Sequence, residues 1–161
     1  MSLEAAPAGA NGRVHGVADL RAFLAGAWRI ARTVRDARLG QDGSFDGTAV
    51  FMEADDGDLL LTETGTLRFG DHAGPAEQTY RYCFPDGPRR AMVFRHDGST
   101  FHDLDLSDGT AEVLHHCGAD IYRGGFRVEG HDTWTVRWLV KGPRKDYDMV
   151  TRYSRVPVPG E

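Results

Sequence analysis

The residues able to do chemistry are densest in the stretch 115–122, HHCGADIY. Alternate side chains of an extended strand share a face, so His116, Asp120 and Tyr122 would lie together. A histidine held in one tautomer by a carboxylate can act as a general base, and a tyrosine beside it can donate a hydrogen bond to a substrate oxygen. This trio is the predicted catalytic set, although Gly118 could reverse the chain and change which residues share a face.

Two other interpretations of this stretch are open. The same side chains can be hydrogen-bonded polar groups that line a pocket without catalysing a reaction. Histidine and cysteine also bind zinc or iron, but the stretch lacks the paired Cys-x-x-Cys or His-x-x-x-His spacing of a strong metal motif. Because no nucleophile elbow accompanies it either, we favour the pocket interpretation and predict no metal ligands.

Charged and aromatic residues elsewhere suit a ligand that is anionic and partly aromatic or apolar. Arg32 shares a strand face with Trp28, so we expect it inside the protein, where its charge needs a carboxylate from the protein or from a ligand. Lys145 can clamp an anionic ligand or form a solvated pair with Asp146, and Tyr147 is in an inward register. The candidate ligand-binding residues are Arg32, Tyr80, Phe101, His102, His116, Lys145 and Tyr147.

Short strands and tight turns must position these residues. Turn signals such as Asp42-Gly43, Asp97-Gly98 and Asp108-Gly109 recur along the chain and indicate a β-meander. A short helix is predicted over 17–26, because apolar residues follow helical spacing and stop at a glycine. We predict strands over 27–36, 45–54, 58–69, 76–84, 90–96, 100–106, 110–117, 119–129, 132–141 and 146–155.

The direction of these strands decides where the candidate residues lie. If every hairpin reverses the chain, the tenth strand runs antiparallel to the first and a barrel can close without a free edge. Most acidic turns then fall at the end where Trp28 begins its strand, and the segments rich in His, Lys and Tyr fall at the other end. The fold class predicted is all-β: a roughly ten-stranded antiparallel up-and-down barrel with a short N-terminal helix and a ligand site at the mouth opposite Trp28.

Size and composition limit the classes of protein that fit. A chain of 161 residues and 17.8 kDa forms one domain. The net charge is −5 with dispersed Lys and Arg, which argues against nucleic acid as a partner. No apolar run approaches the roughly 20 residues that span a bilayer, and no signal peptide is recognisable, so no membrane association is predicted. Two cysteines are too few for a disulfide framework and suit a cytoplasmic protein.

The chain divides into three segments. Residues 1–16 are small, Gly-rich and polar and are expected to be flexible, residues 17–155 form the barrel, and residues 156–161 read as a loose tail. The expected partner is a small-molecule ligand, with no cofactor. A homodimer is possible.

The two ends of the barrel segment resemble a known group of proteins. Gly26-Ala27-Trp28 opens the first strand, and Arg155 or Arg152 returns beside it from the last. This pairing is similar to the calycin group, which includes lipocalins and fatty-acid-binding proteins. The resemblance implies a lipocalin-like barrel in which Trp28 is buried and one of these arginines packs on its ring.

Further segments, 28–32, 101–102, 116–122 and 142–147, resemble a bacterial and fungal family of unknown function, DUF6314, over about 20–155. That resemblance implies a lipocalin-like barrel and brings no established activity. The Gly-x-Trp opening is shared with haem-binding nitrobindin-like barrels, but no isolated histidine lies near the C-terminus. We therefore expect a small-molecule-binding barrel first, a small acid–base enzyme second, and a haem- or metal-binding barrel third.

Overall fold

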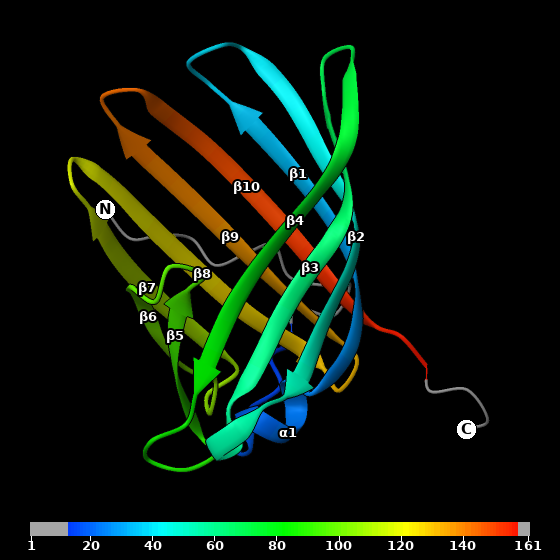
Figure 1. The fold of residues 1–161 in the computed structure, drawn as a ribbon, viewed down its shortest axis with the longest axis vertical. Coiled ribbons are helices and arrows are strands. Elements are labelled where there is room, and N and C mark those ends of the chain that lie inside the picture. Colours follow the sequence, from blue (N-terminus) through cyan, green and yellow to red (C-terminus); the bar gives the residue numbers. More distant parts are fainter. Residues whose placement is uncertain (1–12, 158–161) are drawn as a thin grey trace.

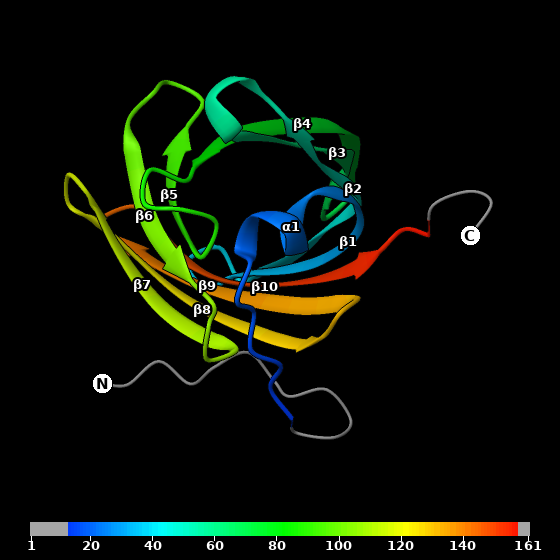
Figure 2. The same cartoon turned by 90° about the horizontal axis from the view of Figure 1, so that it is seen from below.

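The computed structural model describes residues 13–157 as one barrel with a helix at one end (Figures 1 and 2). The expectations for residues 1–12 and 158–161 lie outside the described residues. The helix is α1 (Leu20–Leu24), and a single 3₁₀ turn, η1, spans Asp55–Gly57. The strands are β1 (Gly26–Asp36), β2 (Gln41–Glu53), β3 (Leu59–Phe69), β4 (His72–Cys83), β5 (Arg90–Arg95), β6 (Thr100–Asp105), β7 (Thr110–Cys117), β8 (Asp120–Gly130), β9 (Thr133–Gly142) and β10 (Lys145–Arg155).

All ten predicted strands are present, and every paired neighbour is antiparallel. The predicted return of the last strand beside the first is confirmed, since Trp28 of β1 pairs with Arg155 of β10. The order β6-β5-β4-β3-β2-β1-β10-β9-β8-β7 makes β6 and β7 the two sheet edges. The expectation of a barrel without free edges is therefore wrong: within residues 13–157, no ladder joins β6 to β7, and the barrel is nearly closed.

Chain from outside the sheet fills part of this seam. The backbone N–H of Val17 donates to the carbonyl oxygen of Leu106 at 2.9 Å, and that of His15 donates to Val128 at 2.8 Å. Residues 15–17 thus connect Leu106, which follows β6, with Val128 in β8. Farther up the seam, the rings of Phe101 in β6 and His115 in β7 lie 5.1 Å apart, edge to face.

The helix is shorter than predicted. It begins after Asp19, whose side chain accepts a hydrogen bond from the Ala22 N–H at 2.8 Å, and it ends at Leu24. Gly26, the predicted helix terminus, is already the first residue of β1 with φ 111°, a conformation that glycine adopts without strain. The chain therefore turns from helix to strand within two residues.

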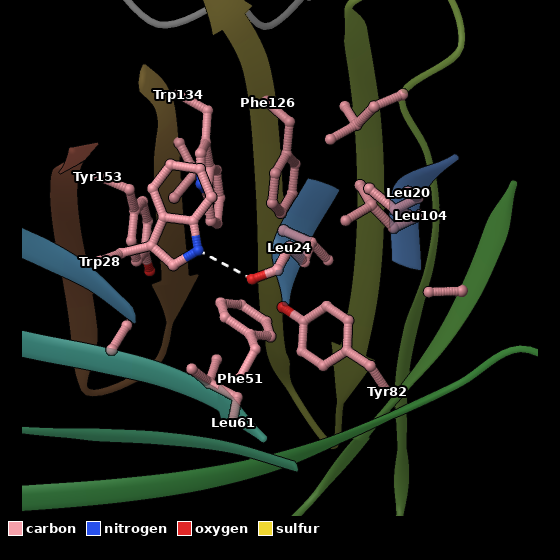
Figure 3. Close-up of a cluster of buried hydrophobic side chains, with 14 of the residues drawn as sticks. Leu20, Leu24, Trp28, Phe51, Leu61, Tyr82, Leu104, Phe126, Trp134 and Tyr153 are labelled. Carbon is pink, nitrogen blue, oxygen red and sulfur yellow. Dashed lines mark hydrogen bonds between the residues drawn. The ribbon is translucent and has the colours of Figure 1, made fainter. Parts of the chain in front are cut away.

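The helix closes one end of the barrel and completes its core (Figures 2 and 3). Leu20, Leu24 and Trp28 have no exposed surface, and the Trp28 indole N–H donates to the Leu24 carbonyl at 2.9 Å. The guanidinium carbon of Arg155 lies 4.1 Å from the centroid of the Trp28 ring. The expected burial of Trp28 under an arginine is confirmed, with Arg155 in that position.

Candidate functional site

A cavity of about 620 Å³ occupies the barrel above this core. The helix and the Trp28 core close the lower end, whereas the lining residue Leu67, toward the upper end of β3, is exposed. The cavity thus opens at the mouth opposite Trp28, as the strand directions predict. Its lining includes Arg32, Asp36, Phe45, Glu63, Tyr80, Arg95, Phe101, His102, Tyr122, Phe126, Trp134, Trp138, Tyr147 and Tyr153.

An ion pair lies in the cavity wall. Nη2 of Arg32 donates to both carboxylate oxygens of Glu63 at 3.1 Å, and Nε donates to Thr151 Oγ1 at 2.7 Å. The Tyr153 hydroxyl donates to Glu63 Oε2 at 2.9 Å. The sequence predicts that a carboxylate of the protein or of a ligand pairs with Arg32. Glu63 supplies the protein carboxylate.

Burial and charge set the protonation of this cluster. Burial, and then the negative charge of Glu63, raise the pKa of Tyr153 well above its ordinary value, so its hydroxyl stays a donor. Burial acts to lower the pKa of Arg32, but Tyr153 and Glu63 outweigh it and the pKa is raised. The cluster is a closed set of charge-assisted hydrogen bonds.

Aromatic rings from four strands form a second part of the wall. Phe101 of β6 stacks with Tyr80 of β4 and with Trp138 of β9, at centroid distances of 6.1 and 5.1 Å. Tyr122 of β8 meets Phe101 edge to face at 6.2 Å. We call these four residues the aromatic wall; flat apolar surfaces of this kind suit a planar ligand.

Arg95, at the end of β5, lies against this wall. Its guanidinium carbon is 5.0 Å from the Phe101 centroid and 5.4 Å from that of Tyr122. Its Nη1 donates to the Cys117 thiol at 3.7 Å. Within residues 13–157, no carboxylate lies within ion-pairing distance of Arg95, in contrast to Arg32.

His102 is a buried histidine in the cavity lining. It is 7% exposed and packs among the rings of Phe101, Phe126 and Trp138. Burial lowers its pKa to about 4; the backbone and charge of Asp103 oppose the shift and the charge of His115 adds to it. His102 is therefore neutral at pH 7.

The predicted catalytic trio is not assembled. Gly118, with φ 60°, lies in the turn that reverses the chain between β7 and β8, so that His115, not His116, pairs with Tyr122. His116 is exposed and lies outside the cavity lining, whereas Tyr122 lies on the lining. Asp120 instead forms an ion pair with Lys145 at 3.2 Å.

Lys145 also departs from its predicted position. Its Nζ donates to the Tyr122 hydroxyl at 3.1 Å, and this bond, followed by that to Asp120, raises the pKa of the lysine. Lys145 thus holds the Tyr122 hydroxyl and does not itself line the cavity. The other candidates do line it: Arg32, Tyr80, Phe101, His102 and Tyr147.

Among the lining residues that were not sequence candidates are two charged ones, Glu63 and Arg95, and the pattern contains a signal for each. Glu63 continues the inward alternation of Leu59 and Leu61 in β3, and Arg95 continues that of Ala91 and Val93 in β5. A charged residue in phase with buried apolar neighbours is expected to face the same interior.

Residues 13–157 contain neither a cluster of metal ligands nor a membrane-spanning helix. No group of three or more His, Cys, Asp or Glu side chains in this range is placed to hold a metal ion. No helix in the same range has the length and hydrophobicity to cross a membrane.

Comparisons with known proteins agree with this fold. The model of a family of unknown function, DUF6314, matches residues 24–155. An S-type phycobiliprotein lyase from Guillardia theta superposes with a TM-score of 0.63 at 9% identity, over 89% of this chain and 94% of that one. A DUF3598 protein of unknown function from Nostoc punctiforme superposes with a TM-score of 0.57 at 15% identity, over 84% of this chain and 49% of that one. No curated protein matches the sequence.

Proposed function

We propose that this chain, which belongs to the DUF6314 family of unknown function, is a binding barrel for a small planar aromatic molecule that carries an acid group. The observation that carries this proposal is the cavity itself, closed at the Trp28 end, open at the other, and walled by aromatic rings. Its volume of about 620 Å³ falls within the roughly 300–1,000 Å³ of small-molecule sites.

The aromatic wall supports a planar ligand. Tyr80, Phe101 and Trp138 are stacked nearly parallel, with interplanar angles of 19° and 13° to Phe101. Rings held in this way by several strands lose little conformational freedom when a flat molecule stacks on them. An aliphatic chain would gain less from such geometry.

Arg95 supports an acid group on the ligand. The charge of Arg32 is already balanced by Glu63, which is 3% exposed, whereas Arg95 lies on the cavity lining with aromatic faces and a thiol as its neighbours. A guanidinium offers two parallel donors to a carboxylate. We therefore assign the recognition of an anion to Arg95.

The alternative of a small enzyme has lost its geometric support. His116, its predicted base, is exposed on the outside of the barrel, and Asp120 is paired with Lys145. A base must come within hydrogen-bond reach of the proton it removes.

A charge deletion tests the proposal. We expect 2-naphthoate to bind the native protein in calorimetric titration, and Arg95→Gln to weaken it about tenfold, the loss of roughly 1.4 kcal/mol from a charge-assisted hydrogen bond. Binding of 2-methylnaphthalene, which lacks the acid, should change less than about twofold. Arg144→Gln is the matched control, because it removes the same charge from an exposed turn at the same mouth.

The proposal is contradicted if the folded native protein binds neither probe. If Arg95→Gln and Arg144→Gln weaken 2-naphthoate equally, the anion is attracted by overall charge and the assignment to Arg95 is wrong.

A further inference from the structure

The tautomer of His102 is determined by its neighbour. Nδ1 lies 2.8 Å from the backbone carbonyl oxygen of Asp103. A carbonyl oxygen can only accept, so Nδ1 must carry the hydrogen. In the neutral ring the other nitrogen, Nε2, then has a free lone pair and can only accept.

This lone pair is unused within the protein. No residue of 13–157 makes a hydrogen bond to Nε2, and the ring belongs to the cavity lining. Its ring contacts are with Phe101, Phe126 and Trp138, which pack against it from β6, β8 and β9. The cavity therefore has a fixed hydrogen-bond acceptor among aromatic surfaces.

We propose that His102 Nε2 accepts a hydrogen bond from an N–H or O–H group of the bound molecule, so that the ligand is an aromatic compound with a ring hydroxyl or ring N–H. This inference rests on the proposed function, because it names a second feature of the same ligand. An acceptor left without a donor in a desolvated site penalises ligands that lack one. His102 thus acts as a selectivity residue.

Neutrality of the ring at working pH supports the acceptor role. Burial keeps the pKa of His102 low, and the charged and titratable groups that act on it are Asp103 and His115. A protonated ring would present a donor at Nε2 and would select the opposite kind of ligand.

Two probes that differ in one donor provide the test. We expect the native protein at pH 7 to bind 2-naphthol, which has a hydroxyl, in preference to 2-methoxynaphthalene, which cannot donate. In His102→Phe the ratio of the two affinities should fall about five- to tenfold, as loss of one hydrogen bond predicts. Comparing ratios between proteins cancels the different hydrophobicity of the probes.

His115→Phe is the matched control. His115 contacts the same Phe101 ring at 5.1 Å but lies outside the cavity lining, so its replacement should leave the ratio unchanged. If His102→Phe does not fold, the ¹⁵N resonance of Nε2 in the native protein provides the readout. It should show an unprotonated nitrogen that shifts with 2-naphthol and stays in place with 2-methoxynaphthalene.

The outcomes separate the two proposals. Binding of both probes with an unchanged ratio in His102→Phe, or a static Nε2 resonance, overturns the role of His102 and leaves the binding barrel intact. Failure of every naphthalene probe to bind overturns the binding barrel itself.

Discussion

Trp28→Ala is expected to lower the free energy of unfolding by about 5 kcal/mol. Removal of a buried tryptophan costs about 3–5 kcal/mol through lost burial and the cavity left behind, and a cation–π contact contributes about 0.5–2 kcal/mol. Trp28 has no exposed surface, lies 4.1 Å from the Arg155 guanidinium, and meets the Trp134 ring at 6.0 Å. Its loss would also leave the Leu24 carbonyl without its donor.

Urea unfolding followed by circular dichroism measures this effect. Trp138→Ala removes the same atoms from the half-buried aromatic wall, which borders the cavity, and should cost clearly less. Equal midpoints for native protein and Trp28→Ala would show that the closed end does not form the stabilising core.

The second large effect concerns the buried ion pair. Arg32→Met would leave the Glu63 carboxylate, 3% exposed, without a counter-charge, and such a change costs about 3–5 kcal/mol. Arg32→Met combined with Glu63→Gln should recover more than half of that loss. The amide is neutral and can still accept the hydrogen bond from Tyr153.

Chemical denaturation of the single and double variants gives the comparison. Arg35→Met is a matched control on the same strand, since its pair with Asp42 is exposed and should contribute less than about 1 kcal/mol. If the double variant is less stable than Arg32→Met alone, the cost does not come from an uncompensated charge.

The strands were predictable because their signals are local. Alternation of apolar and polar residues and turn signals such as Asp97-Gly98 and Asp108-Gly109 place all ten strands to within a few residues of their observed bounds. The turn predicted at Asp42-Gly43 is wrong, because both residues lie within β2 and pair with β1. The helix length and the seam between β6 and β7 depend on long-range contacts instead. The bonds from Val17 to Leu106 and from His15 to Val128 join segments far apart in sequence, and periodicity contains no information about them.

The site was predictable only where one strand determined it. Arg32, Tyr80 and Tyr147 lie on the cavity lining because their inward register follows from their own strands. The grouping of His116 with Tyr122 required the chain to stay extended through Gly118, and the turn there pairs Tyr122 with His115 instead. Which arginine is paired was not predictable, because Glu63 reaches Arg32 across the sheet.

The location of a bound ligand inside the cavity is tested most directly by the indole N–H resonances of the native protein. The chain has three tryptophans; Trp134 and Trp138 line the cavity, and Trp28 is tied to Leu24 in the closed end. Titration with 2-naphthoate should shift the Trp138 and Trp134 signals and leave the Trp28 signal nearly in place, with assignments from tryptophan-to-phenylalanine variants. Saturable binding that leaves both the Trp134 and Trp138 signals unmoved would place the ligand outside the barrel and contradict the account.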